Sequence, residues 1–192
     1  MFAVAQARFE LYEPSYQGYM AIKLVLPQKK MAENLVRKAK LLAEVEKEYT
    51  QILSLGNGDF GIAALTRIGV AYNDFSKALF DAPVPQGLTE EQREIYQSEL
   101  QNRAFPIEEK AIEAYEKALA KSRELHLYND WALTAQDKLA QFKPSEFPEL
   151  HKFSVIADDP FSPGKTATAA EAPKPTEPTT QLLKPTLARP SV

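Results

Sequence analysis

Two histidines are the only imidazole groups in this sequence of 192 residues, and they stand far apart. His126 and His151 are separated by 25 positions, with no cysteine and no further histidine between or beside them. Structural zinc takes four nitrogen or sulfur ligands, so this pattern predicts no metal site. We expect His126 to lie at the C-terminal end of a helix, where an imidazole suits the helix dipole.

Other patterns that could do chemistry have simpler explanations. Neighbouring carboxylates at 90–91, 108–109 and 158–159 could serve in acid–base chemistry. Adjacent helical residues point about 100° apart, however, and acidic residues suit the first turn of a helix. Residues 56–61 contain three glycines but lack the lysine of a phosphate-binding loop. We therefore expect no enzyme, no catalytic residue and no cofactor.

The composition excludes several further classes. With 44% hydrophobic residues, a chain of this length can bury the core of one domain. The absence of cysteine excludes disulfides and thiolate metal sites. A net charge of -3, from 23 basic and 26 acidic residues, argues against nucleic-acid binding. No apolar run approaches the roughly 18 residues of a transmembrane segment, and the first residues do not have the pattern of a signal peptide.

Apolar residues recur at spacings of three and four, which predicts an all-α fold. The helices are expected over residues 2–12, 16–26, 28–55, 59–79, 89–125 and 131–142.

The helix ends are predicted from proline and from capping residues. Pro14 is expected to end the first helix, and Asp59 to accept backbone N–H groups at the start of the fourth. Thr89 and Gln92 have the spacing of a capping box. Because the apolar spacing continues past Pro106, we expect one long helix that is kinked there.

The composition changes after the last helix, which we expect Asn129 or Asp130 to cap. Half of the 14 prolines lie within residues 157–192. Such a stretch cannot bury enough apolar surface to offset its ordering entropy. We therefore expect a helical domain over 1–156 and a disordered tail rich in Pro, Thr and Ala over 157–192. A linker or tether is the expected role of the tail, and a ligand for a proline-binding domain is the alternative.

The predicted helices over 59–79 and 89–125 carry small and large residues at fixed spacings. Small residues let two helices approach closely, and large residues fill the spaces between them. This pattern resembles the tetratricopeptide repeat, although Gly69 and Ala111 are 42 positions apart where an ordinary repeat has about 12. We infer that both helices are lengthened and project as a long hairpin. The residues expected to pack the hairpin are Leu65, Ile68, Gly69, Tyr72, Ala111, Tyr115 and Ala118.

The chain as a whole resembles large tetratricopeptide proteins from the cell envelope of myxobacteria and related deltaproteobacteria. The segments that carry the likeness are 39–50, 64–72, 81–89, 104–111 and 127–131. The resemblance implies antiparallel helical hairpins at the C-terminal end of a longer α-solenoid. It also implies a scaffold in the periplasm or cell envelope, associated with gliding motility. Because this chain shows no signal peptide, the cytoplasm stays open as its location.

Tyrosine and tryptophan are common at binding hot spots, and a solenoid groove displays the first helix of each pair. Most of the eight tyrosines are expected in the core. The residues expected to contact a partner peptide or helix are Arg67, Asn73, Lys77, Tyr128 and Trp131.

Two functions follow as hypotheses. The first is a non-enzymatic protein–protein interaction scaffold, without nucleic acid as a partner. The alternative is a self-associating, coiled-coil-like structural protein, in which the apolar stripe of residues 28–55 pairs with its own copy. Leu42 and Tyr49 would then carry the contact.

Overall fold

In the computed structural model, residues 2–148 are described, and they form five helices without a strand among them. The all-α prediction is confirmed. The predicted tail over 157–192 lies outside the described residues, as does the last part of the predicted domain. The helices are α1 (Phe2–Met20), α2 (Gln28–Ser54), α3 (Gly58–Phe80), α4 (Glu90–Leu125) and α5 (Asp130–Phe142).

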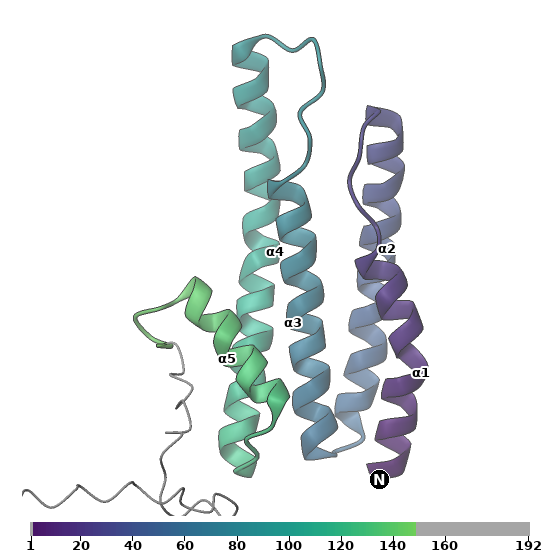
Figure 1. The fold of residues 1–192 in the computed structure, drawn as a ribbon, viewed down its shortest axis with the longest axis vertical. Coiled ribbons are helices and arrows are strands. Elements are labelled where there is room, and N and C mark those ends of the chain that lie inside the picture. Colours follow the sequence, from purple (N-terminus) through teal and green to yellow (C-terminus); the bar gives the residue numbers. More distant parts are fainter. Residues whose placement is uncertain (1, 149–192) are drawn as a thin grey trace, which may run out of the picture. The chain divides into compact units, whose positions relative to one another are not determined.

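The helices form two antiparallel hairpins, α1–α2 and α3–α4, and α5 packs across the second hairpin (Figure 1). Within the described residues, α3 is the one helix that packs against all four others. Its sequence explains this position, because 13 of its 23 residues are buried and they lie on all sides of the helix. The core is therefore built around α3.

The second hairpin is asymmetric, since α4 has 36 residues and α3 has 23. The loop over 81–89 runs along the part of α4 that extends beyond the end of α3 (Figure 1). As predicted, α4 continues through Pro106 and begins at a capping box. There the Thr89 hydroxyl accepts from the N–H of Gln92, and the Gln92 side chain accepts from the N–H of Thr89.

The predicted break at Pro14 is wrong, because α1 runs without interruption to Met20. Pro14 lies on the exposed side of α1, whereas Tyr16 and Tyr19 keep the other side in the core. A proline removes one backbone hydrogen bond, and on the exposed side water can satisfy the carbonyl that loses its partner. The burial of the tyrosines keeps the helix intact.

The predicted cap at Asp59 is also wrong by two positions. Asn57 caps α3, and its side-chain oxygen accepts from the N–H of Phe60 at 3.0 Å. The carboxylate of Asp59 instead accepts from the side-chain amide of Asn129 at 3.0 Å. Of the two residues predicted to cap α5, Asn129 is the one that does, by accepting from the N–H of Ala132. One asparagine therefore joins the N-terminal ends of α3 and α5.

Candidate functional site

The seven residues expected to pack the long hairpin are all buried, four on α3 and three on α4. The closest approach is between Gly69 and Tyr115. A Cβ atom on Gly69 would lie 2.6 Å from Cε1 of the Tyr115 ring, so only glycine fits. The other residues of this set belong to the same hydrophobic core. Small residues thus bring the two helices together, as the repeat pattern requires.

Three residues of the same set also face a groove. Leu65, Ile68 and Tyr72 of α3 line its floor, and the cavity has a volume of about 300 Å³. α2 and α4 form its walls, and each of them packs on α3. The wall residues are Glu46, Thr50 and Leu53 from α2, and Lys110, Glu113, Ala114 and Lys117 from α4.

The rim of this α2–α4 groove is charged. The hydroxyl of Tyr72 donates to the carboxylate of Glu46 at 2.7 Å. Burial, with this hydrogen bond, raises the pKa of Tyr72, which therefore stays neutral at physiological pH. Lys110 lies over the Tyr72 ring, with its Nζ 5.4 Å from the centroid, and Lys117 pairs with Glu113 at 2.7 Å. The groove thus combines an apolar floor with charges of both signs at its edge.

The residues predicted to contact a partner do not form one surface. Arg67 is held inside the fold, because its Nη2 donates to both carboxylate oxygens of Glu13 at 2.9 and 3.0 Å. Its guanidinium also lies over the rings of Tyr16 and Trp131, 4.3 and 4.9 Å from the centroids. This arrangement connects α1, α3 and α5 through one side chain.

The remaining predicted residues lie in separate places. Asn73 is half-buried beside Tyr115, and its side chain partly opposes the burial that raises the pKa of that tyrosine. Lys77 lines a different cavity, together with Asp74 and Asp81. Tyr128 is 73% exposed in the loop between α4 and α5. Among the five, only Arg67 and Trp131 are in contact through a recorded interaction.

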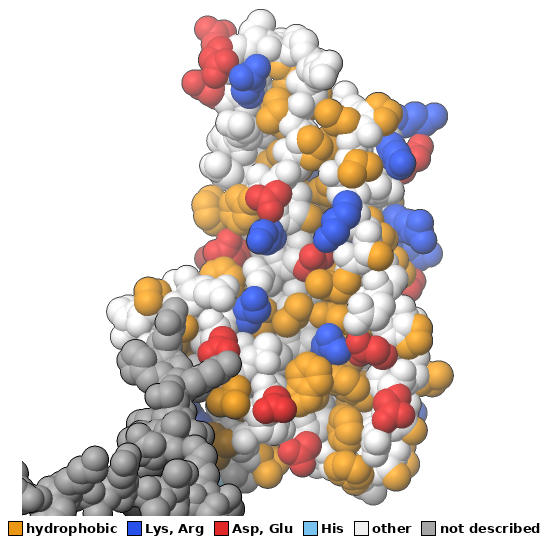
Figure 2. Space-filling model, viewed as in Figure 1, with side chains coloured by type: hydrophobic (Ala, Val, Ile, Leu, Met, Phe, Trp, Pro, Cys, Tyr) orange, Lys and Arg blue, Asp and Glu red, His pale blue; other side chains and the backbone are white. Residues whose placement is uncertain are grey.

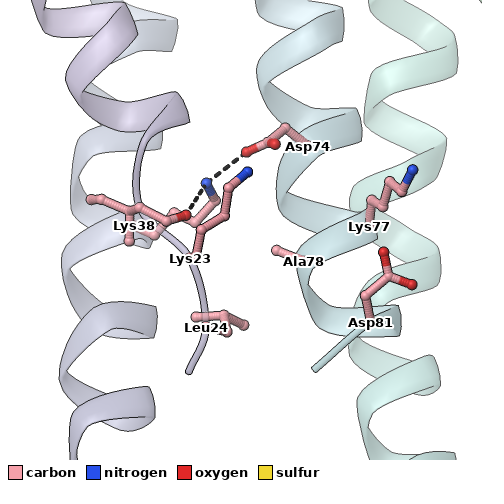
Figure 3. A pocket seen from close by; sticks show the side chains of 8 residues that line it. Lys23, Leu24, Lys38, Asp74, Lys77, Ala78 and Asp81 are labelled. Atoms are coloured by element: carbon pink, nitrogen blue, oxygen red, sulfur yellow. Dashed lines mark hydrogen bonds and ion pairs between the residues drawn. The ribbon is translucent and has the colours of Figure 1, made fainter. Parts of the chain in front are cut away.

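The sequence reasoning missed Lys38, which is 1% exposed. Its Nζ donates to the carbonyl oxygens of Ile22 at 2.9 Å and Tyr19 at 3.2 Å. It also pairs with Asp74 at 2.6 Å (Figure 3). It also lies 4.3 Å from the centroid of the Tyr19 ring. Lys38 therefore binds one carbonyl of the last turn of α1 and one just beyond it, at the point where the chain leaves the helix. The helix predicted over 16–26 ends at Met20 instead.

A cavity of about 350 Å³ opens beside this buried ion pair. Lys23, Lys77 and Asp81 lie around it with Asp74 (Figure 3). The Lys38 ammonium has three N–H donors and three acceptors around it, two carbonyls and the Asp74 carboxylate, so its role is structural. The sequence does indicate that Lys38 is buried, because it stands in register with the apolar stripe of α2. That stripe includes Met31, Leu35, Leu42 and Val45.

The stripe named for self-association lies inside this fold. Leu42 and Tyr49 are 8% and 1% exposed, and both belong to the core. Tyr49 packs edge-on against Phe9 and Tyr16 of α1. Pairing of two copies through Leu42 and Tyr49 would require α1 to leave α2.

Neither a metal cluster nor a helix suited to span a membrane occurs among residues 2–148. No family model, curated protein or solved structure matches the chain. The resemblance to tetratricopeptide proteins therefore stays a prediction.

Proposed function

We propose that the helical unit is a non-enzymatic scaffold that docks a helix of a partner protein in the α2–α4 groove. The observation that carries this proposal is the groove itself, whose floor consists of core residues of α3 and whose rim is charged. An amphipathic helix matches such a surface, because its apolar stripe can cover Leu65, Ile68 and Tyr72 while its flanks meet charges of both signs.

Two lysines on the rim can fix the orientation of a docked helix. Lys110 and Lys117 are seven residues apart on α4, which is about two helical turns. Acidic side chains at the same spacing on a partner could pair with both. Rim charges add mostly to the association rate and to orientation, and the apolar floor adds affinity.

The wider setting of the proposal rests on the resemblance alone. We propose that the chain is the C-terminal part of a tetratricopeptide-type protein in a cell-envelope complex, in which gliding motility is one candidate process. Long rigid helices with no catalytic pattern suit such a scaffold.

Site-specific photo-crosslinking in cells of the source organism tests the proposal. A photo-reactive amino acid replaces Lys117 in the groove, and a matched variant carries it at Ala120, which is exposed on α4 and does not line the groove. The proposal predicts one defined crosslinked protein from position 117 and none from position 120. The same products from both positions would contradict it. Products that contain only a second copy of this chain would favour self-association.

A further inference from the structure

A third cavity lies where α3 and α5 begin, and it has a different chemistry from the groove. Its volume is about 300 Å³. It is lined by three aromatic rings, two carboxylates and one amide, which belong to Phe2, Phe60, Trp131, Asp59, Asp130 and Asn129. No lysine or arginine is among these lining residues, and none of them lines the α2–α4 groove.

The rings are held in place by the aromatic core. Phe60 packs against Phe2 at 5.3 Å and against Phe9 at 5.7 Å between ring centroids. Phe9 in turn packs edge-on against Trp131 at 5.5 Å. The carboxylate of Asp59 is oriented by the side-chain amide of Asn129. The cavity is thus a preorganised combination of aromatic and acidic groups from three helices.

The same combination already holds a cation elsewhere in this cluster. The guanidinium of Arg67 lies over Tyr16, Phe9 and Trp131, and the carboxylate of Glu13 binds it with two hydrogen bonds. The cavity shares Trp131 with that arrangement and adds Asp59 and Asp130. Figure 2 shows acidic side chains set among hydrophobic ones at the end of the molecule where α1 and α3 begin.

We infer that this cavity, which we call the Trp131 cavity, binds the guanidinium group of an arginine side chain from a partner protein. Aromatic faces attract a cation through their quadrupole, and the planar guanidinium stacks on rings while it donates to carboxylates. Asp59 and Asp130 supply two negative charges to neutralise the one positive charge of the ligand. This site is separate from the groove, so either proposal can fail without the other.

The chain provides its own probe, because Trp131 is its only tryptophan. The experiment titrates the full chain with the peptide acetyl-Gly-Arg-Gly-amide at low ionic strength and follows tryptophan fluorescence. Two further peptides replace arginine with citrulline, which is neutral and of the same shape, or with lysine. We expect a saturable change with the arginine peptide and binding at least about tenfold weaker with citrulline. The lysine peptide is expected to bind more weakly than the arginine peptide.

Substitutions in the cavity then test whether the change in tryptophan fluorescence comes from binding there. Asp130→Asn removes an exposed carboxylate that accepts no hydrogen bond from residues 2–148, and Asp59→Asn keeps an oxygen that can still accept from Asn129. Each is expected to weaken arginine binding several-fold, with circular dichroism as the check on folding. Asp137→Asn, on the exposed side of α5 and outside the cavity, is the matched control and should bind as the natural chain does.

Three results would overturn the inference. The citrulline peptide could change the fluorescence as strongly as arginine does. The Asp130→Asn variant could bind the arginine peptide with unchanged affinity. The Asp59→Asn variant tests the same point independently. Lysine could bind as tightly as arginine, which would contradict the assignment to a guanidinium.

Discussion

The ring of Tyr115 on α4 packs directly on the backbone of Gly69 on α3. A Cβ atom at position 69 would lie 2.6 Å from Cε1 and 2.7 Å from Cδ1 of that ring. Tyr115 is completely buried. This contact sets how closely the two helices of the long hairpin approach each other, and the groove floor depends on that hairpin.

Gly69→Ala should therefore destabilise the fold. Forcing a methyl group into a close-packed core costs about 1–3 kcal/mol, which exceeds the gain of about 0.5–1 kcal/mol from alanine in a helix. Urea unfolding measures the change in the free energy of unfolding.

Gly18→Ala is the matched control for this prediction. Gly18 is an exposed glycine within α1, and nothing lies within 4 Å of a Cβ atom added there. This variant should gain about 0.5–1 kcal/mol. An equal gain at position 69 would show that Tyr115 does not limit the approach of the helices.

Loss of the Lys38 ammonium should destabilise the fold by about 3 kcal/mol or more. Lys38→Met keeps the apolar stem and most of the length of the side chain, but it removes the partner of the Asp74 carboxylate and a donor to the carbonyls of Tyr19 and Ile22. Lys40→Met, on the exposed side of α2, should change the free energy of unfolding by less than about 0.5 kcal/mol. The double variant Lys38→Met/Asp74→Leu should lose less than the sum of its single changes, and additive losses would contradict the coupling.

Two buried tyrosines should respond differently to replacement by phenylalanine. The Tyr19 hydroxyl donates to the carbonyl of Ala71 at 2.6 Å, so Tyr19→Phe should lose about 1 kcal/mol of stability. The Tyr49 hydroxyl has no hydrogen-bond partner within residues 2–148. Tyr49→Phe should therefore be neutral or stabilising by up to about 1 kcal/mol. Equal losses in the two variants, measured by urea unfolding, would refute this difference.

The buried tyrosines also predict a loss of stability in alkali. Burial raises the pKa of Tyr19, Tyr49 and Tyr115 above the ordinary value. Above about pH 10 the unfolded chain releases these phenol protons while the folded chain keeps them. The folded state then binds more protons than the unfolded state, so the free energy of unfolding falls as the pH rises toward the folded pKa values. Below about pH 9 these groups should add no pH dependence.

Urea unfolding at about pH 8 and about pH 11 checks this sign. Tyr49→Phe removes one of the three groups and should lose less stability between the two pH values than the natural chain does. An identical loss in both proteins would exclude Tyr49 as a contributor.

Much of the fold follows from local sequence signals. The period of three and four in the apolar residues of α2 and α4 places both helices, and the hydroxyl of Thr89 with the amide of Gln92 marks the start of α4. The failure at Pro14 has a tertiary cause, because the burial of Tyr16 and Tyr19 against other helices outweighs one lost backbone hydrogen bond. Such packing is not visible in local spacing.

The candidate sites were predicted only in part. The spacing of Leu65, Ile68 and Tyr72 marked the helix that forms the groove floor, but α2 forms one wall, and no pattern within α3 or α4 indicates it. Trp131 was expected at a surface, whereas its association with Phe2 and Phe60 depends on how α5 folds back onto α1 and α3. Contacts between segments so far apart in the chain arise from the three-dimensional packing.

The most direct test of the account blocks the groove without disturbing the core. Thr50→Trp places a large side chain on the exposed wall of the groove in α2, and Ala43→Trp makes the same change on α2 outside the groove. Crosslinking from position 117 is then measured in both backgrounds. The docking account predicts that Thr50→Trp abolishes the crosslinked partner and that Ala43→Trp leaves its yield unchanged. An undiminished yield with Thr50→Trp would show that the partner does not occupy the α2–α4 groove.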